Sequence, residues 1–194
     1  MLGRQLHHQR KHRVGGGAVR LAPIGTHGVL GLCEGIETGL AWEIAPHWRA
    51  YGSYTYNDST YQDDVVSASG TTPLKGKTAV DAPKNLAKLE LGYDDGSLFA
   101  RLGASRVGKR YYTYTNDASV DAYTLLDVAG GYRFGEVGML KELALQLNVT
   151  NLADEEYVST IGSNGFTNAD PNGTGQTLLA GAPRQFFVTL NGRF

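Results

Sequence analysis

Two cations and three tyrosines lie close together in one stretch of the chain, at Lys109, Arg110, Tyr111, Tyr112 and Tyr114. Guanidinium and ammonium groups pair with anions, and tyrosine rings pack against flat or cationic groups. The stretch is therefore suited to bind an anionic ligand with aromatic parts. The alternative is that these tyrosines only form an aromatic rim at the end of a β-barrel, where such rings gather.

Other groups that could do chemistry lack the spacing that the chemistry needs. His7, His8 and His12 are not followed by a carboxylate at ligand spacing, which favours a solvated basic tail over a metal site. No GxSxG elbow or other nucleophile context occurs. We therefore expect no enzyme, no cofactor and no metal. Five carboxylates also lack the alternating pattern of a calcium-binding loop, so we expect them to be solvated loop charges. They are Asp63, Asp64, Asp154, Glu155 and Glu156.

The composition excludes several classes of protein. The 18 Lys and Arg residues balance 19 Asp and Glu residues, so there is no electrostatic case for nucleic acid. A mean hydropathy of -0.27 argues against membrane-spanning helices. Barrel strands remain possible because only every second residue of such a strand is apolar. High contents of glycine (26) and tyrosine (11) favour strands and turns.

Alternating polarity begins at Gly35 and divides the chain in two. Residues 1 to 34 show neither helical nor strand periodicity, and we expect them to be poorly structured. Residues 35 to 194 form the predicted barrel segment. Their alternating stretches are about ten residues long, as a tilted strand needs to cross a bilayer. There are seven: 36–44, 47–57, 86–93, 98–107, 122–134, 143–151 and 185–194.

Segment 143–151 has the clearest alternation, with apolar Leu143, Leu145, Leu147 and Val149 separated by smaller or polar residues. The pattern predicts an all-β fold, namely part of an antiparallel transmembrane barrel with seven strands, or eight if the residues before Gly35 supply one. A few residues break the rule. Tyr123, Leu125 and Phe187 fall on the polar face, and Arg106 falls on the apolar face near a strand end, where it could snorkel.

The connections alternate in length, since each short one (45–46, 94–96, 135–141) is followed by a long one (58–82, 108–120, 152–182). Short periplasmic turns and long extracellular loops are the layout of outer-membrane barrels. Aromatic residues of the apolar face lie near the ends of the strands, which predicts two interfacial belts. Those near the short turns are Trp42, Trp48, Tyr93, Tyr132, Phe134 and Phe194, and those near the long loops are Tyr54, Tyr56 and Phe186.

Several stretches resemble the last barrel strands of TonB-dependent receptors. NVTNLADEEY (148–157), its continuation VSTIGSNGF (158–166) and the ending GAPRQFFVTLNGRF (181–194) are similar to the final two strands. GKRYYTYTNDASVDAYTLLDVAGGYRF (108–134) resembles the strands before them, and WRAYGSYTYNDSTYQDD (48–64) an earlier strand and loop. The resemblance covers residues 35 to 194.

The resemblance implies the carboxy-terminal part of a bacterial outer-membrane barrel of about 22 strands, plugged by an amino-terminal domain. Such a receptor binds a ferric siderophore outside the cell and imports it with energy from the TonB complex, which acts through the plug. With seven or eight strands and no plug, this chain is not expected to transport alone. The resemblance also implies a final strand that the barrel-assembly machinery recognises, through Phe186, Val188, Leu190 and Phe194.

Two other interpretations remain. A complete small barrel with a structural or adhesion role would need residues 1 to 34 to supply an eighth strand. A secreted β-sandwich that binds sugar would need polar outer faces, which the apolar faces with aromatic ends contradict.

Overall fold

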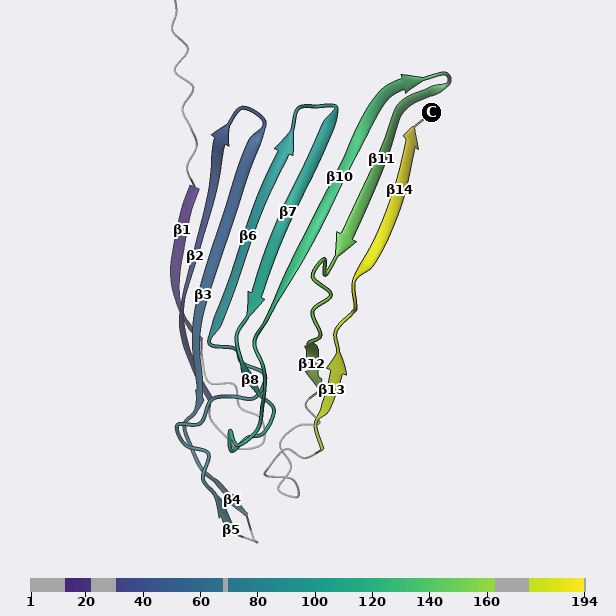
Figure 1. Ribbon diagram of the computed structural model, residues 1–194. Coiled ribbons are helices and arrows are strands. Elements are labelled where there is room, and N and C mark those ends of the chain that lie inside the picture. The colour runs from purple at the N-terminus through teal and green to yellow at the C-terminus, as the bar shows by residue number, and fades with distance from the viewer. Residues whose placement is uncertain (1–12, 22–30, 68–69, 163–174, 194) are drawn as a thin grey trace, which may run out of the picture.

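The computed structural model describes residues 13–21, 31–67, 70–162 and 175–193. Eight long strands form one antiparallel sheet, and consecutive strands of the sheet lie side by side (Figure 1). Within these residues, no helix is long and apolar enough to cross a membrane. The sheet contains, in order, β1 (Arg13–Leu21), β2 (Gly31–Ala45), β3 (Trp48–Tyr61), β6 (Asn85–Asp94), β7 (Leu98–Val107), β10 (Tyr123–Val137), β11 (Leu140–Thr150) and β14 (Gln185–Arg193).

The seven predicted strands are confirmed, and β1 is the eighth. Strand β1 pairs with β2 along its whole length, with Val14 opposite Leu40. Strand β1 and the first residues of β2 thus lie before Gly35, where the sequence left an eighth strand open. Glycines at 15 to 17 interrupt the alternation, so pairing with β2 and not a local pattern defines this strand. Residues 1–12 and 22–30 lie outside the described part, and the division into two domains stays a prediction.

The sheet is open. Strands β1 and β14 are its two edges, and no pairing joins them within the described residues. The eight strands are thus part of a barrel and do not close into the small barrel of the alternative interpretation.

Strand register gathers the predicted apolar residues on one face, called the apolar face below. Directly opposed residues of antiparallel strands point to the same side, so each row of partners extends across the sheet. Leu89 is 64% exposed and Val188 is 73% exposed, although both lie in the middle of their strands. One such row contains Trp42, Ala50, Leu91, Leu102, Val128, Val149 and Phe186.

The opposite, polar face carries ion pairs and three of the predicted exceptions. The Glu90 carboxylate lies 3.8 Å from the Lys88 ammonium and 4.0 Å from the Arg101 guanidinium. Phe99 also lies on this face, opposite Gly131, where an added Cβ would come within 2.5 Å of the Phe99 ring. Only glycine fits there. The register confirms Tyr123, Leu125 and Phe187 on this face, opposite Val107, Ser105 and Asn148.

Connections differ at the two ends of the sheet (Figure 1). Turns of two or three residues join β2 to β3, β6 to β7 and β10 to β11 at the end where β14 also finishes. In the second turn, backbone N–H groups of Leu98 and Ser97 donate to Asp95 and lower the pKa of that carboxyl. The long connections contain three hairpins, β4 (Val65–Ser67) with β5 (Gly70–Thr72), β8 (Arg110–Tyr111) with β9 (Ser119–Val120), and β12 (Val158–Gly162) with β13 (Thr177–Ala180).

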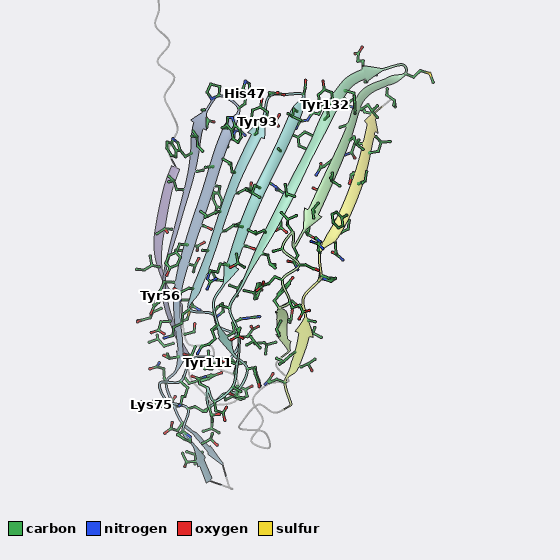
Figure 2. All side chains as sticks on the ribbon, in the orientation of Figure 1. His47, Tyr56, Lys75, Tyr93, Tyr111 and Tyr132 are labelled. Atoms are coloured by element: carbon green, nitrogen blue, oxygen red, sulfur yellow. The ribbon has the colours of Figure 1, made fainter. Side chains whose placement is uncertain are left out.

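Aromatic residues mark both ends of the apolar face. Near the short turns, Trp48 packs on Tyr93 at 5.1 Å between ring centroids, and Tyr132 on Phe134 at 5.0 Å. Tyr56 lies toward the long loops, far along the sheet from Tyr93 and Tyr132 (Figure 2). An apolar band between two aromatic belts matches a membrane interior between its two interfaces.

We expect the substitution Leu147→Arg to destabilise the protein at its full natural length by about 2 to 4 kcal/mol, because it places a cation in the middle of the apolar band. The neighbour Gln146 lies on the polar face, and Gln146→Arg should cost less than about 1 kcal/mol. Denaturant titration of the protein folded in lipid vesicles measures both. Equal costs would show that the two faces are assigned wrongly.

Candidate functional site in the long loops

A small buried cluster holds together the connections from β3 to β6 and from β7 to β10. Its members Val65, Leu74 and Tyr114 are buried, and Tyr61 and Val80 pack against them. The rings of Tyr61 and Tyr114 lie 6.1 Å apart, and the Tyr61 hydroxyl accepts the Val80 N–H at 3.2 Å. These two connections therefore form one packed unit at the long-loop end of the sheet (Figure 1).

Asn116 stabilises this unit through two hydrogen bonds between its side-chain amide and the backbone of Thr78. Its side-chain oxygen accepts the Thr78 N–H at 2.7 Å, and its amide N–H donates to the Thr78 carbonyl at 2.9 Å. Asn116 has a φ of 60°, a left-handed conformation that asparagine tolerates better than most residues. Nearby, the Asp81 N–H donates to the Tyr111 carbonyl at 3.0 Å.

Arg110 connects this unit to the third long connection. Its side chain is buried, and Nη1 donates to the Asp81 carboxylate at 2.8 Å. The same guanidinium donates to the carbonyl of Ser159 at 3.3 Å and to that of Val158 at the start of β12. It also lies 5.8 Å from the centroid of the Tyr123 ring. Five fixed N–H donors let one arginine satisfy partners on several segments at once.

The third connection packs on the polar face through a second contact, since the Tyr157 and Tyr123 rings lie 4.4 Å apart. Its first turn is organised by Asn151, which is almost fully buried. The Asn151 side chain accepts the Glu155 N–H and donates to the carbonyls of Glu155 and Ala182. The stretch 148–157 thus has a structural role in setting where this loop starts.

The five predicted ligand residues separate into groups. Arg110 and Tyr114 are buried in loop packing. On the other side of β8, Lys109 donates to the Tyr111 hydroxyl at 3.1 Å and lies 4.6 Å from the centre of its ring. Tyr112 is half-buried and directly follows β8. Figure 2 labels Tyr111 among the loop residues. Ligand contact by these side chains stays a prediction.

The predicted carboxylates are surface or structural groups. Asp64 accepts the N–H groups of Leu74 and Lys75 at 2.9 and 2.8 Å, and Asp154 accepts the Arg184 N–H at 2.8 Å. No set of three or more His, Cys, Asp or Glu side chains in the described part of the chain could hold a metal ion. His7, His8 and His12 lie outside that part.

Sequence reasoning missed Asp81 and Asn116, which join loops far apart in the chain. Neither has a local pattern around it. Their roles depend on partners 29 and 38 residues away, so only the folded loops reveal them.

The protein-family model described as "TonB dependent receptor-like, beta-barrel" matches residues 34–152, more than half of the chain. The chain belongs to this family of TonB-dependent receptor barrels. The match includes β3, β6, β7, β10, β11 and most of β2, together with the loop residues Lys109 to Tyr114.

Two curated receptors align with the chain over most of its length. The ferrioxamine B receptor of Salmonella typhimurium (strain LT2) is 32% identical over 135 residues, which is 67% of this chain and 18% of the receptor. The catecholate siderophore receptor Fiu of Escherichia coli K12 is 29% identical over 169 residues, or 83% of this chain and 19% of Fiu. The chain thus spans about a fifth of the length of these relatives.

A solved receptor also has this fold. The ferric preacinetobactin receptor BauA of Acinetobacter baumannii matches with a TM-score of 0.66 and 26% identity, over 93% of this chain and 26% of BauA. The open sheet of this chain is therefore similar to one part of a larger receptor barrel.

We expect Arg110→Ala to release the third long connection from the other two. The loss of the bonds to Asp81, Val158 and Ser159 should cost about 1 to 3 kcal/mol, discounted because Asp81 remains partly exposed to water. Amide hydrogen exchange in residues 151–162 should accelerate, whereas the neighbouring exposed substitution Lys109→Ala should leave it unchanged. Unaltered exchange in Arg110→Ala would refute this role.

Proposed function

We propose that this chain is the carboxy-terminal barrel portion of an outer-membrane TonB-dependent receptor for ferric siderophores, located in the bacterial outer membrane. The observation that carries the proposal is the apolar face. In the seven strands of the sheet whose side chains the structure describes, apolar residues form one continuous surface with aromatic residues at both ends. A soluble protein rarely exposes an apolar surface of this extent. Outer-membrane lipid is the environment that fits it.

The ligand proposal rests on the relatives and on the loops. The Salmonella relative is named a receptor for ferrioxamine B, and Fiu a receptor for catecholate siderophores. Within the loop unit, Tyr112 is our candidate for direct contact with the chelate, because it stays partly accessible directly after Arg110 and Tyr111. Arg110 and Tyr114 are positioning residues, which fix the backbone that presents Tyr112. We assign no catalytic role to the chain, whose family consists of receptors.

We further propose that these residues do not transport by themselves. The motivating observation is the open sheet: among the described residues, the outer edges of strands β1 and β14 have no ladder partner for their backbone N–H and C=O groups. Such groups are costly in lipid, which is why membrane barrels are closed. Transport would need further strands to close the barrel and a plug through which the TonB complex acts.

The transport proposal is tested by expressing these 194 residues behind an export signal in a strain that lacks siderophore receptors. We expect no growth when ferrioxamine B or a ferric catecholate is the only iron source. The matched control is Fiu, which should restore growth on the catecholate. Growth supported by the chain alone, and abolished when TonB is removed, would contradict the proposal.

The final strand is proposed as the segment that the barrel-assembly machinery recognises. Phe186, Val188 and Leu190 share the apolar face and are 66%, 73% and 67% exposed. One edge of β14 pairs with β11, and the other edge has no partner strand in the part of the chain that the structure describes. A free edge with large side chains at alternate positions suits recognition by strand addition. Phe194 lies outside the described residues, and its part in the signal is carried over from the resemblance.

Deleting Phe194 from the protein at its full natural length should sharply lower the amount inserted into the outer membrane of cells. Spontaneous folding into detergent should change little, because recognition and folding stability are separate properties. Quantitative immunoblotting of membrane fractions measures the first, and heat-modified electrophoretic mobility the second. Normal insertion in cells after the deletion would exclude the signal role.

A further inference from the structure

Arg106 is a cation on the apolar face. Its partners in the register are Ala87 on β6 and Thr124 on β10, and the same row continues through Tyr54 to Thr38. The guanidinium donates to the Thr124 hydroxyl at 3.0 Å. Within the described residues it has no carboxylate partner. A full positive charge therefore faces the same side as the lipid-contacting leucines, with one neutral hydrogen bond.

Arg106 lies at the point along its strand where the lipid headgroups would be. The next row toward the short turns is Leu40, Gly52, Leu89, Ala104 and Leu126, which is wholly apolar. The row of Arg106 contains Tyr54, whose hydroxyl donates to Asn85 at 2.6 Å. Tyrosines of this kind mark the interface of a membrane. Arg106 thus lies at the boundary between hydrocarbon and headgroups.

Two lysines lie just beyond this boundary. Lys84 directly precedes β6 and Lys109 lies between β7 and β8. The Gly108 N–H donates to the Asn85 carbonyl, which holds the two segments that carry these lysines side by side. The Lys84 ammonium contacts the Asp58 carboxylate at 2.9 Å, a hydrogen bond that raises the pKa of Lys84, and Tyr56 and Tyr111 contribute smaller effects. Lys109 contacts Tyr111. Asp58 balances Lys84, which leaves Arg106 and Lys109 as the two cations of this surface without an acidic partner among the described residues.

From this arrangement we infer that Arg106 and Lys109, supported by Lys84, bind the phosphate group of a lipid in the extracellular leaflet. Arginine forms bidentate hydrogen bonds with phosphate oxygens, and lysine adds a point charge. The neighbouring tyrosines and leucines would contact the acyl chains of the same lipid. This inference rests on the proposed membrane orientation, in which the long loops are extracellular.

The test uses the protein at its full natural length, extracted in mild detergent from the outer membrane of the cells that make it and reconstituted with lipid A. Native mass spectrometry counts the lipid A molecules that the protein retains. We expect retention of phosphorylated lipid A, and a decrease of about fivefold for each cation removed in Arg106→Gln and Lys109→Gln. Arg106→Lys, which keeps a charge, should lose less than Arg106→Gln.

The matched control is Arg101→Gln, because Arg101 lies on the same strand with its side chain on the polar face. It should retain lipid A like the unaltered protein. The inference fails if Arg101→Gln loses as much as Arg106→Gln, or if the unaltered protein retains dephosphorylated lipid A equally well. The comparison of phosphorylated with dephosphorylated lipid A uses only the unaltered protein, so it tests the inference even if a variant does not fold. Absence of the protein from the outer membrane would instead refute the proposed function.

Discussion

Backbone hydrogen bonding in an apolar surrounding is the constraint on which the rest of the structure depends. No water is available within a bilayer to satisfy peptide groups, so each strand must pair with a neighbour. Pairing sets the register, and the register places every second side chain on the apolar face. The apolar rows, the aromatic belts and the polar face with its ion pairs all follow from the pairing of eight strands.

Local sequence patterns predict the strands well and the loops poorly. The alternation at Leu143, Leu145 and Leu147 directly reflects the two environments on either side of β11, so a short stretch suffices to predict it. Glycines 15 to 17 interrupt the alternation in β1, so this strand is recognised only by its pairing with β2. Arg106, which broke the alternation, is confirmed on the apolar face by its register with Ala87.

The loop residues show why a cluster of promising side chains is insufficient to define a site. Lys109, Arg110 and Tyr114 are close in sequence, but their side chains lie in different surroundings in the folded loops. Tyr114 enters a core with Val65 and Leu74, and Arg110 becomes a bridge between connections. These partners come from distant parts of the chain, so no period or motif around residue 110 could reveal them.

Arg110 holds the third connection by backbone carbonyls, those of Val158 and Ser159. A carbonyl is present whatever the side chain, so the attachment places no demand on residue type at these two positions. The sequence of this loop is therefore free to change while its point of attachment persists. Receptors could acquire new outer surfaces in this way from a single fixed anchor.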